Sequence, residues 1–102
     1  MTEEHQLRSG DILILTSDSS LSLHVGPYML SKLVWFTGIE AAFTVLQTCR
    51  REQSRRAQYE VTWYSILCPS GQIAYLQLSD VDTGVIMTNS EPTIKFVRLS
   101  DC

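Results

Sequence analysis

The chain has 102 residues, a net charge of −3 at pH 7 and a hydrophobic fraction of 44%. This length suits one domain, and the composition indicates a globular fold and excludes general disorder. The apolar runs are too short to span a bilayer, and the acidic, polar start is unlike a signal peptide. The sequence therefore predicts a cytoplasmic protein with a flexible tail over residues 1–9 and a single domain over residues 10–102.

Short strands are predicted in the first third of the chain. Residues 11–16 form an apolar run that begins after Gly10 and ends at a Ser/Asp cluster. Residues 21–25 alternate apolar and polar side chains until a Gly-Pro pair interrupts them, which fits either a second short strand or a packed loop. Residues 33–37 are rich in strand-forming side chains, including Trp35, and favour a third strand.

The middle of the chain, residues 38–56, fits two different structures. Thr37 and Glu40 have the spacing of a helix capping box, and apolar residues then recur at helical intervals. The segment 43–49 is dense in β-branched and aromatic residues, which is typical of a strand. The pattern favours the strand but leaves the helix open, and in the strand interpretation the basic segment 50–56 forms a hairpin tip.

The clearest local signal is a hairpin within residues 61–81. Pro69 presets φ for the first central position of a turn, and Gly71 can adopt the left-handed conformation that follows. This is the pattern of a three-residue hairpin with a glycine bulge, in which Cys68 pairs with Gln72. The register then pairs Leu67 with Ile73, Ile66 with Ala74, Ser65 with Tyr75, Tyr64 with Leu76 and Trp63 with Gln77.

Both faces of this hairpin are apolar. Alternation of side chains puts Tyr64, Ile66, Ala74, Leu76 and Leu78 on one face and Trp63, Leu67, Ile73 and Tyr75 on the other. A sheet with one solvated face shows polar residues there, so the second apolar face is either covered within the chain or contacts a partner. The candidate partner-binding residues are therefore Trp35, Trp63, Leu67, Ile73 and Tyr75.

The C-terminal part is predicted to hold short elements only. Residues 78–84 indicate a single helical turn that a glycine stops, and residues 85–87 indicate a short strand. Residues 93–99 favour a last strand or edge.

Two stretches of the chain carry a family likeness. One is Trp63-Tyr64-x-Ile66-Leu67-x-x-Ser70-Gly71-x-Ile73 followed by Leu78-Ser79-Asp80-Val81, and the other is Gly10-Asp11-Ile12-Leu13. Together they resemble small SH3-like barrel proteins of tailed phages and marine bacterial genomes. The resemblance implies an all-β fold with room for one helix, built as a small barrel of about five strongly bent antiparallel strands. It implies no activity, because this fold hosts many roles, and it implies a virion-associated protein if the chain is phage-encoded.

Signatures of catalysis and metal binding are missing from the sequence. It contains no phosphate loop, no Gly-x-Ser-x-Gly and no His-Glu-x-x-His. His24 has no second histidine or carboxylate at ligand spacing, and Cys49, Cys68 and Cys102 lack the Cys-x-x-Cys spacing of a zinc site. We therefore expect a protein that is not an enzyme and that holds no metal or cofactor.

Two functions remain. The first is an interaction or assembly module that binds a protein partner or itself, as a homodimer, through the second hairpin face. The alternative is a small nucleic-acid-binding barrel that uses Arg50, Arg51, Arg55 and Arg56 with a stacking aromatic residue. The rest of the chain is acidic and opposes a polyanion, so the sequence favours the first function and predicts no membrane partner.

Overall fold

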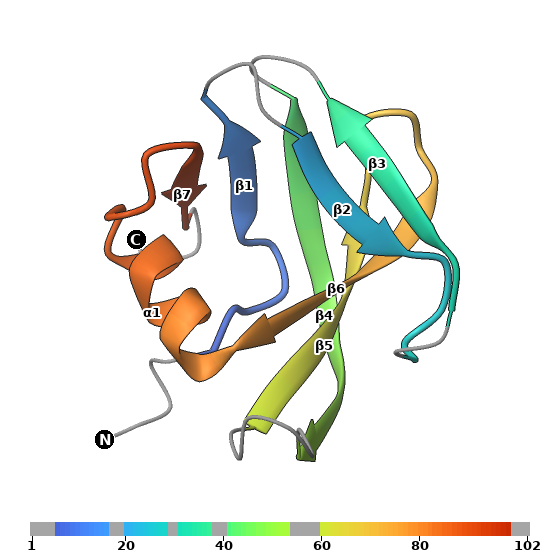
Figure 1. Cartoon of the computed structure of the whole chain (residues 1–102). Helices are drawn as coiled ribbons and strands as arrows, with labels where there is room; N and C mark the ends of the chain where they lie inside the picture. The colour runs from blue at the N-terminus through green and yellow to red at the C-terminus, as the bar shows by residue number, and fades with distance from the viewer. Residues whose placement is uncertain (1–5, 17–19, 29–30, 38–40, 54–59, 99–102) are drawn as a thin grey trace.

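The computed structural model describes residues 6–16, 20–28, 31–37, 41–53 and 60–98, and for Ser20, Gln53 and residues 35–37 it describes the backbone alone. Seven strands and one helix follow one another along this part of the chain (Figure 1). They are β1 (Ile12–Leu15), β2 (Ser20–His24), β3 (Leu33–Thr37), β4 (Ala42–Gln53), β5 (Glu60–Leu67), β6 (Ile73–Ser79), α1 (Asp80–Met87) and β7 (Ile94–Val97).

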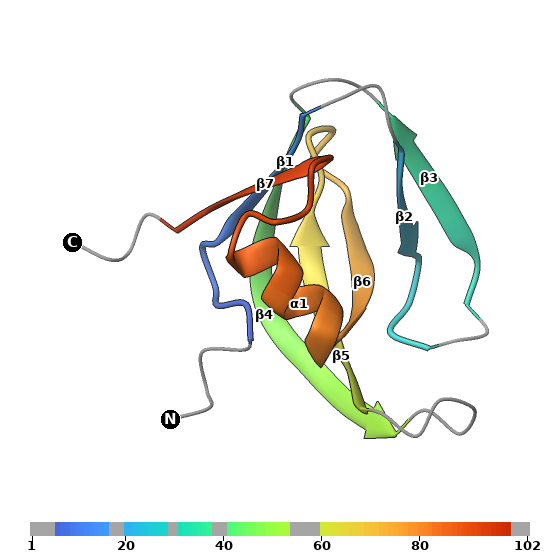
Figure 2. The same cartoon turned by 60° about the vertical axis from the view of Figure 1, so that its left-hand side comes forward.

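The strands form one antiparallel sheet in the order β3-β2-β6-β5-β4-β1-β7. The sheet curls so that β2 and β3 stand opposite β1 and β7, and α1 packs beside β5, β6 and β7 (Figures 1 and 2). In the described chain β3 and β7 end the sheet and do not pair with each other, so the sheet is not closed. The all-β prediction is confirmed, whereas a barrel of about five strands is not, because seven strands share this open sheet.

The structure decides the middle of the chain in favour of the strand. β4 is a twelve-residue strand that pairs with β1 at one end and with β5 along most of its length. Its register with β5 shifts between Val45 and Gln47 and again between Thr48 and Arg50. Such bulges bend a strand and increase its twist, which lets one long strand follow the curl of the sheet. The helix considered for residues 38–56 is therefore wrong over the described residues 42–53.

The hairpin register predicted from the sequence is confirmed. β5 and β6 pair Leu67 with Ile73 and continue in step to Trp63 and Gln77. The Cys68 N–H donates to the Gln72 carbonyl oxygen at 2.8 Å, and the Gly71 N–H donates to the Cys68 carbonyl oxygen at 2.9 Å. Gly71 has φ +91°, the left-handed conformation that the glycine bulge requires.

Gly71→Val should lower the free energy of unfolding by about 1–3 kcal/mol, because a β-branched residue resists positive φ. A Cβ at position 71 would meet nothing within 4 Å, so backbone strain rather than a clash causes the loss. Ser70→Ala, in the same exposed turn, should leave stability nearly unchanged. Urea unfolding of the two variants checks this, and equal midpoints would contradict the assigned turn.

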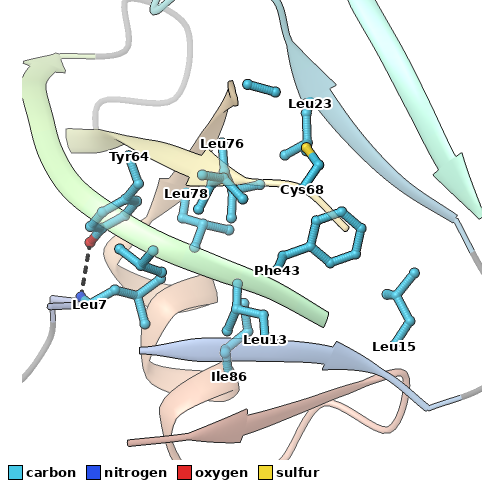
Figure 3. Packing of buried hydrophobic residues seen from close by; sticks show 13 residues of the cluster. Leu7, Leu13, Leu15, Leu23, Phe43, Tyr64, Cys68, Leu76, Leu78 and Ile86 are labelled. Atoms are coloured by element: carbon cyan, nitrogen blue, oxygen red, sulfur yellow. Dashed lines mark hydrogen bonds between the residues drawn. The ribbon is translucent and has the colours of Figure 1, made fainter. Parts of the chain in front are cut away.

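The hydrophobic core lies on the inner face of the curled sheet. Figure 3 shows leucines from β1, β2 and β6 around Phe43 of β4, with Ile86 of α1 closing one side. Each such side chain contributes about 1.5–3 kcal/mol on burial. One predicted hairpin face supplies a large share of this core, namely Tyr64, Ile66, Ala74, Leu76 and Leu78.

Leu7 anchors the N-terminal segment to the core. Leu7 is buried, and its N–H donates to the hydroxyl oxygen of Tyr64 at 3.2 Å (Figure 3). Burial raises the pKa of the Tyr64 phenol, which therefore stays a neutral hydroxyl near pH 7. The flexible tail expected over residues 1–9 thus does not include Leu7, and residues 1–5 lie outside the described chain.

A buried ion pair joins the two ends of the described chain. Arg98 donates from Nε to Oδ1 and from Nη2 to Oδ2 of Asp11, each at 2.9 Å. Asp11 is 1% exposed, and its carboxylate also accepts from the N–H of Arg8 at 2.7 Å. The hydrogen bonds from both residues compensate the burial of this carboxylate.

The helix α1 is longer than the sequence indicated. The Ser79 hydroxyl caps its first turn by accepting from the Asp82 N–H at 3.1 Å, and two aspartates lie in that turn, where the helix dipole favours negative charge. Gly84 does not stop the helix, because Ile86 in the next turn is buried in the core. The strand predicted for residues 85–87 is therefore wrong, whereas a last strand within residues 93–99 is confirmed as β7.

Candidate protein-interaction surface

One row of directly paired residues runs across five strands on the face opposite the core. The pairing connects β7, β1, β4, β5 and β6 at one level of the sheet. Directly paired residues in an antiparallel sheet point to the same side, so this row belongs to one surface. Its members are Val97, Ile12, Thr44, Leu67 and Ile73.

This row, together with Tyr75, is called the outer patch below. Ile73 is 56% exposed, and the other members are partly buried. Four of the six side chains are aliphatic and one is aromatic, while polar residues normally cover the solvated face of an antiparallel sheet. Of the five candidate residues, Ile73 is the most exposed, and Leu67 and Tyr75 are partly exposed.

Trp63 occupies a different position from the rest of its predicted face. It is fully buried, and its indole makes an edge contact with the His24 ring at a centroid distance of 4.9 Å. Its Nε1 has no hydrogen-bond partner among the described residues. Within this structure Trp63 thus supports the β2–β6 junction, where His24 pairs with Tyr75, and presents no surface to a partner.

The fifth candidate, Trp35, lies in the middle of β3, opposite Ser22 of β2. Only its backbone is described, so its side chain is not placed on either face. The structure therefore brings Leu67, Ile73 and Tyr75 together on the hairpin and separates Trp35 from them by β2.

Exposed apolar residues also gather on the β2–β3 hairpin, which the sequence analysis did not single out. Val25, Tyr28 and Leu33 are 52%, 59% and 46% exposed. The guanidinium carbon of Arg50 lies 5.7 Å from the Tyr28 ring centroid, which is the geometry of a cation–π contact. The only sequence signal here was the alternation around the Gly26-Pro27 break, and that pattern carries no information on exposure.

Two of the four arginines considered for nucleic acid already have acidic partners. Arg50 forms an ion pair with Glu52 at 3.0 Å, and Arg51 contacts Glu60 at 2.6 Å and Asp80 at 3.4 Å. These contacts raise the pKa of Arg51, chiefly through its hydrogen bond to Glu60. Both arginines lie on β4, paired with Trp63 and Thr62, and not in a loop.

Arg55 and Arg56 lie outside the described residues, so their part of the predicted cluster is not placed. The two described arginines share their surroundings with three carboxylates, which offset the positive charge that a polyanion would need.

The titratable groups within the described ranges form no recognisable reactive centre. No group of three His, Cys, Asp or Glu side chains in these ranges is arranged to hold a metal ion. Burial raises the pKa of the Cys68 thiol, which makes it less reactive, while the thiol of Cys49 is exposed. None of the helices in these ranges has the length and apolar character that a membrane crossing requires.

Comparison of the chain with protein-family models, with curated proteins and with solved structures finds no match. The geometry of the outer patch is therefore the basis for inferring what this protein does.

Proposed function

We propose that this protein is a non-enzymatic interaction or assembly module, which binds a protein partner or itself through the outer patch. The observation that carries this proposal is the row from Val97 to Ile73, a strip that is apolar except at Thr44 and crosses five strands, with Ile73 more than half exposed. An apolar strip on a rigid sheet loses little conformational entropy when a partner covers it.

A protein partner fits this surface better than a nucleic acid does. The outer patch contains no charged side chain, whereas phosphate recognition needs several unpaired cations. Arg50 and Arg51 are engaged with carboxylates of the same chain. Arg50 and Arg51 are therefore less suited to binding phosphates than the sequence suggested, which weakens the nucleic-acid alternative.

The likeness to small SH3-like barrel proteins is part of this proposal. Its support is the curled antiparallel sheet, the tight β5–β6 hairpin and the short helix that precedes the last strand. A location in the cytoplasm, or in a virion if the chain is phage-encoded, stays a prediction from the sequence.

A photo-reactive amino acid at position 73 tests the outer patch. In the cells from which the chain comes, irradiation should give a covalent adduct with one protein or with a second copy. The same amino acid at Val81, which is 74% exposed on α1, is the control and should give little adduct. No adduct at position 73, or equal adducts at both positions, would contradict the proposal.

Once the adduct is identified, Ile73→Lys should weaken its binding by about tenfold or more, because a charge would lie in the contact. Val81→Lys should leave the affinity unchanged. Both substitutions are at exposed positions, so each should change the free energy of unfolding by less than about 0.5 kcal/mol. Titration calorimetry measures the affinity, and urea unfolding verifies the fold.

A further inference from the structure

Among the described residues, β3 ends the sheet, and one side of its backbone pairs with no other strand. Its register with β2 pairs His24 with Leu33 and continues to Ser20 with Thr37. The Val25 N–H donates to the Lys32 carbonyl oxygen at 2.9 Å, which makes that pair a hydrogen-bonded one. Such pairs alternate along an antiparallel ladder, so the N–H and C=O groups of Leu33, Trp35 and Thr37 point away from β2.

The opposite end of the sheet is protected in a way that β3 is not. On β7 the outward N–H of Phe96 donates to Oδ1 of Asn89 at 2.8 Å, and Nδ2 of Asn89 donates to the Phe96 carbonyl oxygen at 3.5 Å. Asn89 has φ +57°, and both polar atoms of its side-chain amide contact this edge. Lys95 is exposed beside it, and lysine on an edge strand discourages pairing with another chain.

None of these protective features is present in the described part of β3. Its sequence, Leu-Val-Trp-Phe-Thr, contains no charge and no proline, and its register with β2 has no bulge. The exposed apolar side chains Val25, Tyr28 and Leu33 belong to the same hairpin. An open edge next to exposed apolar side chains is the usual template for strand addition.

We propose that β3 pairs with β3 of a second copy of this chain, antiparallel and about a two-fold axis at Trp35. The outward groups at positions 33, 35 and 37 are symmetric about that residue, so the edge is complementary to itself. Trp35 would exchange two hydrogen bonds with Trp35 of the partner subunit, and Leu33 would do the same with Thr37 of the partner subunit. The two sheets would become one continuous sheet.

The residue types along β3 favour the same arrangement. Val34 would lie opposite Phe36 of the partner subunit, an aromatic and β-branched pair that stabilises antiparallel sheets. This inference rests on the proposed function in treating the protein as an interaction module, but it uses the sheet edge and not the outer patch.

Hydrogen exchange of single amides in the wild-type chain tests the proposal without any substitution. At high protein concentration the amides of Leu33, Trp35 and Thr37 should exchange at least about tenfold more slowly than at high dilution. The amides of Val34 and Phe36, which bond to β2, should be protected at both concentrations. Sedimentation should give twice the chain mass of 11.5 kDa at high concentration. A single-chain mass with unprotected outward amides throughout would overturn the inference.

Leu33→Pro provides the matched variant, because it removes one outward N–H at the first residue of the strand, where proline is tolerated. This variant should be monomeric with an unchanged circular dichroism spectrum, whereas Leu33→Ala, which keeps the N–H, should still dimerise. Ile73→Lys should also leave the dimer intact. A dimer that is lost in Ile73→Lys but kept in Leu33→Pro would overturn the edge pairing and leave the outer patch as the binding surface. A chain that stays monomeric but forms an adduct at position 73 would likewise overturn the edge pairing and support the outer patch as the binding surface.

Discussion

Asp11→Ala should lower the free energy of unfolding by about 3–5 kcal/mol, because the Arg98 guanidinium would stay largely buried without the carboxylate that offsets its charge. The side chain of Arg98 is 11% exposed and that of Asp11 is 1% exposed, so water replaces the lost contacts poorly. The substitution also removes the acceptor for the Arg8 N–H and loosens the attachment of the N-terminal segment to Arg98, the residue that follows β7. Urea unfolding measures the change.

Arg50→Ala is the matched control for this experiment. It breaks the ion pair with Glu52, whose two side chains are 43% and 25% exposed. An exposed pair contributes about 0–1 kcal/mol, so the control should unfold close to the wild-type midpoint. If the two variants lost equal stability, the contact between Asp11 and Arg98 would not have the structural role assigned to it.

Phe43→Ala should cost about 3–5 kcal/mol, because it removes a buried ring and leaves a cavity in a closely packed core. Phe43 is fully buried and lies directly opposite Leu13 on β1, near the centre of the cluster in Figure 3. Val81→Ala, on the exposed side of α1, should change stability by less than about 0.5 kcal/mol. A midpoint for Phe43→Ala close to that of Val81→Ala would mean that the core is centred elsewhere.

The structure shows which of the candidate binding residues are exposed, and the alternation of side chains along a strand could not show this. Alternation correctly puts Trp63, Leu67, Ile73 and Tyr75 on one side of the hairpin. Whether each is covered depends on β2, which joins β6 through His24 and brings an imidazole against the Trp63 ring. That contact connects residues 39 positions apart, and no local pattern encodes it.

The helix α1 illustrates the same limit. Gly84 lowers local helix propensity, which made a single turn and a following strand reasonable predictions. Burial of Ile86 against the sheet and capping by Ser79 outweigh that preference. Asn89 then ends the helix and covers the edge of β7, a role that only the folded chain makes visible.

The sequence by itself determined the features that depend on neighbouring residues. Pro69 and Gly71 define the turn, the turn defines the register of β5 and β6, and the register defines which side chains share a face. The β-branched segment 43–49 likewise indicated a strand, because strand preference is expressed within a few residues.

The tertiary structure alone decided how many strands join the sheet, which of them end it, and which face of the hairpin stays open. Those outcomes follow from pairings between distant segments, such as β1 with β7 and β2 with β6. Each pairing depends on the burial and hydrogen bonding of the whole sheet. The residues of one strand do not specify which distant strand will lie beside it.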